Sequence, residues 1–300
     1  MSDKASEFVG IFDQAIRSLE AEGLSYSEPQ SFCAYRDSLE KKPTNSTKNT
    51  AQILSVQKKE DLQRELVESG YMIFRLGKRE GQKGSYFGLA KLKNPDDWSE
   101  YFLIDADLFK GVEKQIFLPN VSIRQLFAFN LLSDLTENSL INLAISSGLM
   151  ASALGIETSE SLAAPASASG TFNFQFKANC DENAPVWDHE QGQVEIDALF
   201  VGRRGKQEIL FVIEAKTSEK YQSLAKHKLV YPILALRNKI PDCIQVIPVY
   251  LRVVKSKNNR EIDFYVAECK PINIQEVVSV STLEVRKPCK HYVLFGFNEQ

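Results

Sequence analysis

Two apolar segments joined by a glycine-containing turn place the strongest limit on how this chain can fold. They read QVEIDALFV (193–201) and QEILFVIEAK (207–216). The second is apolar along most of its length, which is typical of a central strand covered on both faces. A helix is expected over 218–239, and further strands at 243–254 and 261–269. Strands in succession with one crossover helix predict a mixed β-sheet flanked by helices, of the α/β or α+β class.

The first half of the chain has a different pattern. Apolar residues at helical spacing predict helices over 1–30 and 57–69. Two apolar segments, YMIFRL (71–76) and YFGLAKL (86–92), flank a glycine-rich basic stretch and indicate a hairpin. A third strand over 100–109 would complete a small antiparallel sheet.

A segment rich in Ser, Ala and Pro separates the two halves. It reads ETSESLAAPASASG (157–170) and is typical of a linker or a long loop. Helices are expected before it, between residues 122 and 155. We therefore divide the chain into an N-terminal helical and small-sheet region (1–156), this linker and a C-terminal core (171–300).

Composition argues for a protein of a reducing compartment. No run of eighteen apolar residues exists, so we expect no membrane span. The N-terminus, MSDKASEF, lacks the pattern of a secretion signal. Five scattered cysteines without a C-x-x-C pair, and only three histidines, argue against a disulfide framework and a thiolate zinc site. We expect a cytoplasmic location.

Positive charge is concentrated in one part of an acidic chain. The formal net charge is −3, yet residues 201–260 hold 13 Lys and Arg against four Asp and Glu. Such a basic island is typical of a face that binds a polyanion. A solvated helix and a lysine-rich turn would give the same count.

Three charged residues interrupt the two apolar strands: Asp197, Glu214 and Lys216. Side chains two residues apart on a strand share a face, so Glu195 points the same way as Asp197. Glu214 and Lys216 are related in the same way. With the turn placed over 202–206, Asp197 lies about six residues before its centre and Glu214 about ten after it. A direct meeting would therefore need a bulge, a curved strand or a stagger.

Converging carboxylates would call for a cation. Two of them about 4 Å apart repel by roughly 4 kcal/mol at an effective dielectric near 20. With few histidines, the chain favours a hard ion, Mg²⁺, with Mn²⁺ able to substitute. Such an ion holds a phosphate oxygen and lowers the pKa of a bound water. Lys216 would orient that water or stabilise charge on the phosphate, so the parts match hydrolysis of a phosphodiester bond.

At this point the residues resemble a known group. The pattern G-x-x-E-I-D-h-h-h, then h-h-h-E-x-K, which runs here from Gly192 to Lys216, resembles the PD-(D/E)XK nuclease superfamily. Its members include type II restriction endonucleases and DNA repair nucleases, share a mixed sheet flanked by helices, and cut nucleic acid with Mg²⁺. The resemblance covers about residues 170–270. Ile196 stands where the name of the superfamily has proline.

The resemblance implies a restriction-endonuclease-like core and a role for each charged residue. Asp197 and Glu214 would bind Mg²⁺, Glu195 would serve a second ion, and Lys216 would be the catalytic lysine. The function implied is a Mg²⁺-dependent endonuclease acting on double-stranded DNA, most like a type II restriction enzyme. A homodimer is expected, because cutting both strands of a symmetric site calls for two active sites. The N-terminal region would then supply DNA recognition or dimer contacts.

Polar and basic side chains near these residues are candidate DNA contacts. They are Gln222, Lys226 and Lys228 after the E-x-K motif, Arg203 and Arg204 in the glycine turn, and Lys78, Arg79 and Lys83 in the N-terminal hairpin. On a helix, Gln222 and Lys226 would share a face. Two alternatives stay open: a structure-specific repair or antiphage nuclease of the same superfamily, and a catalytically silent DNA-binding protein.

Overall fold

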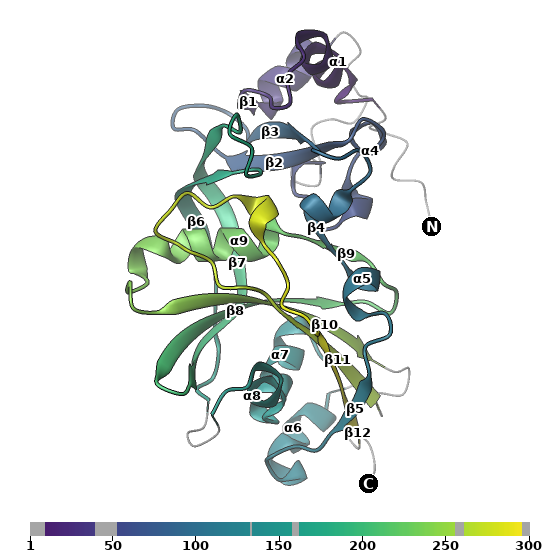
Figure 1. Ribbon diagram of the computed structural model, residues 1–300, viewed down its shortest axis with the longest axis vertical. Helices are drawn as coiled ribbons and strands as arrows, with labels where there is room; N and C mark the ends of the chain where they lie inside the picture. The colour runs from purple at the N-terminus through teal and green to yellow at the C-terminus, as the bar shows by residue number, and fades with distance from the viewer. Residues whose placement is uncertain (1–9, 40–52, 133, 158–161, 256–260, 296–300) are drawn as a thin grey trace.

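One mixed sheet of ten strands runs through most of the molecule (Figure 1). The structure, a computed structural model, describes residues 10–39, 53–132, 134–157, 162–255 and 261–295. The path of the sheet is, in spatial order, β1 (Gln30–Ser31), β3 (Tyr86–Lys91), β2 (Tyr71–Gly77), β7 (Val186–Arg204), β8 (Gln207–Thr217), β10 (Gln245–Lys255), β11 (Glu261–Glu268), β12 (Lys290–Phe295) and β5 (Lys114–Phe117). β6 (Ala166–Lys177) pairs with β7 beside this path. The pairs β2–β7, β8–β10 and β12–β5 are parallel and the others antiparallel, so the predicted mixed sheet is confirmed.

The long hairpin of β7 and β8 lies at the centre of the sheet. Arg204 and Gln207 pair at its end, so the turn consists of Gly205 and Lys206 alone. Gly205 has a φ of 59°, a conformation that glycine adopts without steric cost and that two-residue hairpin turns require. The side chains of residues 209–213 in β8 are all buried, which confirms a strand covered on both faces.

Helices cover the two faces of this hairpin. α7 (Glu137–Ser146) and α8 (Leu149–Leu154) share a core with Ala198 and Phe211 on one face. α9 (His227–Leu236) covers the other, where its Ile233 packs with Leu210 and Val212. Figure 1 shows α9 on one side of β8 and α7 and α8 on the opposite side. Because strand side chains alternate, every second residue of β7 and β8 faces α9.

The N-terminal region packs three short helices with β1, β3 and β2 in one core: α1 (Asp13–Glu22), α2 (Phe32–Ser38) and α4 (Arg64–Glu68). η2 (Lys59–Asp61) lies instead beside residues 223–225, where the N–H of Lys59 donates to the hydroxyl of Ser223. The predicted hairpin of 71–76 and 86–92 is confirmed, with β2 and β3 antiparallel. The region joins the core where Gly77 of β2 pairs with Glu190 of β7.

The remaining elements are short. They are η3 (Trp98–Glu100), β4 (Phe102–Ile104), α5 (Asp105–Phe109), η4 (Ile123–Leu126), α6 (Phe127–Asn130), β9 (Ser223–Ala225), η5 (Arg237–Lys239) and η6 (Val280–Thr282). β4 and β9 form a separate two-stranded sheet. No helix in the described part of the chain has the length and apolar character needed to cross a lipid bilayer.

Two predicted elements are wrong, and for the same reason. The helix predicted over 218–239 begins only at His227, and the strand predicted over 100–109 ends at Ile104. Residues 223–225 instead pair with β4, where Ser223 lies opposite Ile104. Asp105 fixes this pairing, because its N–H donates to the carbonyl of Gln222 and its carboxylate accepts from the N–H of Gln222. These bonds join positions 117 residues apart.

Other expected elements are shorter or differently placed. The helix predicted over 57–69 is divided into η2 and α4, and the region 122–155 holds η4, α6, α7 and α8. Of the predicted linker 157–170, residues 158–161 lie outside the described residues and residues 166–170 begin β6. β5, from the region 1–156, pairs with β12 of the region 171–300.

Candidate functional site

The register of the central hairpin brings Asp197 next to Glu214. Ala198 pairs with Ile213 as the last pair of the ladder, so the next position on β7 faces the next position on β8. Beyond this pair the backbone N–H of Ala215 donates to Oδ2 of Asp197 at 2.9 Å. The side chains of Asp197, Glu214 and Lys216 all belong to the face of the sheet that α9 covers, because they alternate with residues of the opposite core.

Glu214 is a buried carboxylate at the centre of the site. Its side chain is 2% exposed. Two ammonium groups face Oε1, with Nζ of Lys216 at 2.9 Å and Nζ of Lys228 at 3.5 Å. Oε2 has no hydrogen-bond partner among the described residues. Burial raises the pKa of Glu214. The charges of Lys228 and Lys216 lower this pKa, the charge of Asp197 raises it, and the net shift is upward.

Lys216 lies between two carboxylates. Besides Glu214, its Nζ lies 3.8 Å from Oε2 of Glu137, the first residue of α7. The other oxygen of Glu137 accepts a hydrogen bond from the backbone N–H of Thr217. Burial lowers the pKa of Lys216, but Glu214 and Glu137 outweigh it and the net shift is upward. Lys216 is therefore held as an ammonium beside the carboxylates.

The donor set fits a hard divalent cation held in part by the protein. No group of three or more His, Cys, Asp or Glu side chains in the described ranges is placed to hold a metal ion. Asp197 and Glu214 supply two carboxylates, and Oε2 of Glu214 has no hydrogen-bond partner in the described part of the chain. Mg²⁺ is commonly bound through one or two carboxylates, with waters and substrate phosphate completing its shell. A zinc site would need more protein ligands.

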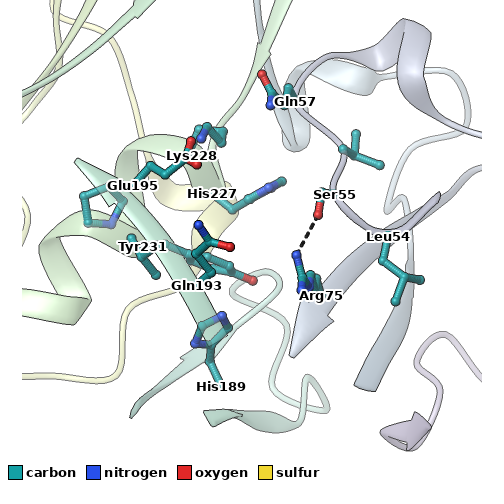
Figure 2. Close-up of a pocket in the computed structure, with 13 residues that line it drawn as sticks. Leu54, Ser55, Gln57, Arg75, His189, Gln193, Glu195, His227, Lys228 and Tyr231 are labelled. Atoms are coloured by element: carbon teal, nitrogen blue, oxygen red, sulfur yellow. Dashed lines mark hydrogen bonds between the residues drawn. The ribbon is translucent and has the colours of Figure 1, made fainter. Parts of the chain in front are cut away.

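Glu195 takes a different position from the other acids. It lies two residues before Asp197 on β7, and its side chain is exposed. It lines a cavity with a volume of about 150 Å³ that also includes Lys228. Figure 2 shows the two walls of this cavity: residues 54–57 and Arg75 on one side, β7 and α9 on the other. The cavity therefore adjoins the carboxylate site through Lys228.

The candidate DNA contacts after the E-x-K motif do not share an exposed helix face. Lys226 is 6% exposed and its Nζ donates to the backbone carbonyl of Ser281, so the prediction that it meets DNA is wrong. Gln222 lies before β9 and is held by Asp105 through its backbone. Lys228, the second residue of α9, points to Glu214.

The remaining candidates lie away from the carboxylates. Arg204 is seven residues from Asp197, about 24 Å along an extended strand. Its guanidinium forms two hydrogen bonds to Glu268, at 2.9 and 2.8 Å, while Arg203 lies 3.5 Å from Glu157. The turn between β2 and β3 holds Lys78, Arg79 and Lys83. Lys78 and Lys83 are exposed there, and the Arg79 guanidinium lies over the ring of Tyr86 at 4.6 Å.

Sequence reasoning missed several groups around the site. Glu137 has no local signal, since it lies 77 residues before Glu214 in the chain. Arg75 and His227 line the cavity beside the site, and each has a buried nitrogen without a hydrogen-bond partner among the described residues. The sequence YMIFRL offered one signal, because Arg75 is the lone charge in an apolar strand.

The comparisons with known proteins give one match. A family model with the description "Domain of unknown function (DUF6997)" matches residues 105–285, more than half of the chain. The matched residues include the central hairpin, α9 and Glu137. Neither the comparison with curated proteins nor that with solved structures gives a match.

Proposed function

This chain belongs to the family of the domain of unknown function DUF6997, and from the geometry of its site we propose that it is a Mg²⁺-dependent endonuclease that hydrolyses DNA phosphodiester bonds. The proposal includes a core of the PD-(D/E)XK type within residues 171–300. A mixed sheet flanked by helices supports it, as does the placement of an acid on one strand and E-x-K on the antiparallel neighbour.

One observation carries the proposal: Glu214 is buried, its Oε2 has no hydrogen-bond partner among the described residues, and it lies opposite Asp197 with Lys216 beside it. Lys216 and Lys228 offset the charge of Glu214, but Asp197 places a second negative charge beside it. In buried ion pairs kept for stability, hydrogen bonds normally satisfy the remaining oxygen as well, and Oε2 has none among the described residues. The pattern therefore favours a site that is kept for binding over one kept for stability.

Each residue has a distinct task in the proposed reaction. Asp197 and Glu214 would hold Mg²⁺, which when bound polarises a phosphate oxygen and lowers the pKa of a water. Lys216 would place its ammonium near the attacked phosphate and stabilise the negative charge that develops there. The hydrogen bond from Ala215 to Oδ2 orients the Asp197 carboxylate, and Glu137 positions Lys216. Glu195 remains available to a second ion at the edge of the site.

The substrate and assembly follow as parts of the same proposal. Double-stranded DNA cut at a specific sequence, as by a type II restriction enzyme, would need two such sites, and we propose a homodimer for that reason. The N-terminal region would read the DNA or join the subunits, with Lys78, Arg79 and Lys83 placed on an exposed turn.

The test is a cleavage assay on unmodified duplex and branched DNA with Mg²⁺ or with EDTA. We expect cleavage only with Mg²⁺, and its loss in Asp197→Ala, Glu214→Ala and Lys216→Ala. Matched controls on the same hairpin are Glu208→Ala and Lys206→Ala, which change exposed residues of like charge far from the site. Thermal unfolding of every variant separates lost chemistry from lost folding.

The outcomes distinguish the candidate functions. Fragments of defined size from duplex DNA would support a restriction enzyme, and cuts confined to branched substrates a repair or antiphage nuclease. DNA binding without cleavage under Mg²⁺ or Mn²⁺ would leave only the catalytically silent DNA-binding protein and contradict the proposal.

A further inference from the structure

The cavity beside the carboxylate site has unusual walls. Three buried polar atoms without a hydrogen-bond partner in the described ranges belong to its lining: Nε of Arg75, Nδ1 of His227 and the hydroxyl of Tyr231. Buried polar groups in native proteins are nearly always paired, so such a concentration calls for an absent partner. Water or a polar ligand would supply that partner.

The size of the cavity limits the ligand to one small ring. Its volume is about 150 Å³, and a cavity of about that volume accommodates a single benzene ring. Aromatic surface is present in the lining, where the rings of His227 and Tyr231 lie with centroids 5.1 Å apart. A flat ring with polar edges fits both the volume and the unpaired groups.

The charges in the lining argue against a phosphate group. Burial and the nearby cations lower the pKa of His227 to about 3 and that of His189 to about 4, so both rings are neutral at pH 7. Lys228 is already paired with Glu214, and the negative charge of Glu195 balances the positive charge of Arg75 in the lining. The lining thus offers donors and acceptors together, which suits a neutral heterocycle with both.

The position of the cavity relates it to the carboxylates. Lys228 belongs to both, and Glu195 lies two residues, about 7 Å of strand, from Asp197. A nucleotide next to a phosphate held at Asp197 and Glu214 would therefore have the cavity within reach of its base. Figure 2 shows Gln57 and Gln193 on different walls of the cavity, and each amide carries both donors and an acceptor.

We propose that this cavity binds a single pyrimidine base, turned out of the stacked strand, next to the phosphate that the carboxylate site would hold. The inference rests on the proposed nuclease function for its biological meaning, but the binding itself needs neither metal nor cleavage. Unstacking a base costs a few kcal/mol, which stacking and edge hydrogen bonds in the pocket would offset.

The test measures binding of free nucleosides directly. Saturation-transfer NMR with cytidine, thymidine, adenosine and guanosine, in EDTA, reports which rings contact the protein. We expect transfer to the pyrimidine ring protons, and at least about tenfold weaker binding in Gln193→Trp and in Gln57→Trp, which fill the cavity from opposite walls. Both positions are exposed at the rim, so either substitution leaves the core unchanged.

Two control variants separate this inference from the nuclease proposal. Gln207→Trp adds the same side chain at an exposed position on β8 outside the cavity and should bind nucleosides as the wild type does. Glu214→Gln should bind them even if it cleaves nothing. A wild type that shows no transfer to pyrimidine ring protons would overturn the inference whether or not it cuts DNA, and normal cleavage by Gln193→Trp would then leave the nuclease proposal intact. A crystal structure with ordered water alone in the cavity at saturating cytidine would overturn it as well.

Discussion

The backbone N–H of Ala215 donates a hydrogen bond of 2.9 Å to Oδ2 of Asp197, at the point where the pairing of β7 and β8 ends. The bond takes the place of the next ladder bond and turns the carboxylate of β7 toward β8. It engages one oxygen of Asp197 and leaves Oδ1 for another ligand. The two strands can therefore part without separating the two acids.

Metal binding should depend on pH through Glu214. Burial raises the pKa of this carboxyl above its ordinary value of 4.5, and Lys228 opposes the rise. A protonated carboxyl binds no cation, so Mn²⁺ affinity should fall as pH falls through the pKa of Glu214. In Lys228→Met the opposing charge is gone, and the midpoint should move to higher pH. Calorimetric titration with Mn²⁺ over a pH series measures it, and exposed Lys220→Met is the control. An unmoved midpoint would show that Lys228 does not act on Glu214.

Gly77 should be intolerant of any side chain. It has a φ of 79°, and a Cβ there would lie 1.9 Å from the carbonyl oxygen of Glu190. The backbone of Lys78 bonds that same oxygen, so the contact cannot relax without opening the junction of β2 and β7. We expect Gly77→Ala to lower the free energy of unfolding by more than about 3 kcal/mol.

Gly81 provides the matched control for that measurement. Its φ is 73°, but a Cβ there would meet nothing within 4 Å. Gly81→Ala therefore tests backbone strain alone, for which we expect a loss of about 1 kcal/mol in chemical denaturation. Equal losses in the two variants would show that the close approach to Glu190 does not matter.

The buried pair of Asp105 and Arg252 should be important for folding. Their side chains are 1% and 2% exposed, with 3.1 Å between Nε and Oδ2. Asp105 also accepts from the hydroxyl of Tyr250 and the N–H of Gln222. Asp105→Ala leaves a buried cation unpaired and should cost about 3–5 kcal/mol of unfolding free energy.

An exposed ion pair gives the comparison. Lys270 and Glu284 form one on the surface, and Glu284→Ala should cost less than about 1 kcal/mol. Urea denaturation of the two variants measures both. A loss of unfolding free energy in Asp105→Ala as small as that in Glu284→Ala would show that Asp105 is not needed to hold β4 against β9.

Acid should destabilise the protein through its buried histidines. Burial lowers the pKa of His189 to about 4, whereas an unfolded histidine titrates near 6.5. The unfolded chain thus binds the proton first, so the stability present above pH 6.5 is lost as pH falls toward 4. One such histidine contributes a slope of roughly 1.4 kcal/mol per pH unit in that range. His189→Asn should show a shallower decline, measured by denaturation at stepped pH. An unchanged slope would contradict the assignment.

The sequence identifies the residues of the site but does not locate the turn between the two strands. With the turn placed over 202–206, Asp197 and Glu214 are not opposite each other in the hairpin. The observed turn consists of Gly205 and Lys206. Each acid then lies seven residues from its end of the turn, so no bulge or stagger is needed. Two glycines in one short segment made both placements possible, and only the two-residue turn matches the pairing of both strands.

What the sequence could not predict depends on contacts between distant segments. Residues 218–226 have a helical pattern but do not form a helix, because Gln222 bonds to Asp105 and residues 223–225 pair with β4. These partners lie more than 100 residues away in the sequence, so a short stretch of sequence cannot reveal them. Likewise, a lysine is normally expected on the surface, but Lys226 is buried and donates to the carbonyl of Ser281. The alternation of apolar residues in β7 and the continuous apolar run in β8 are local signals, and for that reason those strands were predicted well.

Manganese binding tests the central claim most directly, namely that Asp197 and Glu214 hold one ion together. The electron paramagnetic resonance signal of free Mn²⁺ reports how much is bound by the wild type, Asp197→Asn, Glu214→Gln and the double variant. Asp188→Asn, an exposed acid on the same strand, is the control. The account predicts that each single variant loses the tightest site, that the double variant loses no more, and that the control binds as the wild type. Undiminished tight binding in Asp197→Asn or in Glu214→Gln would contradict it.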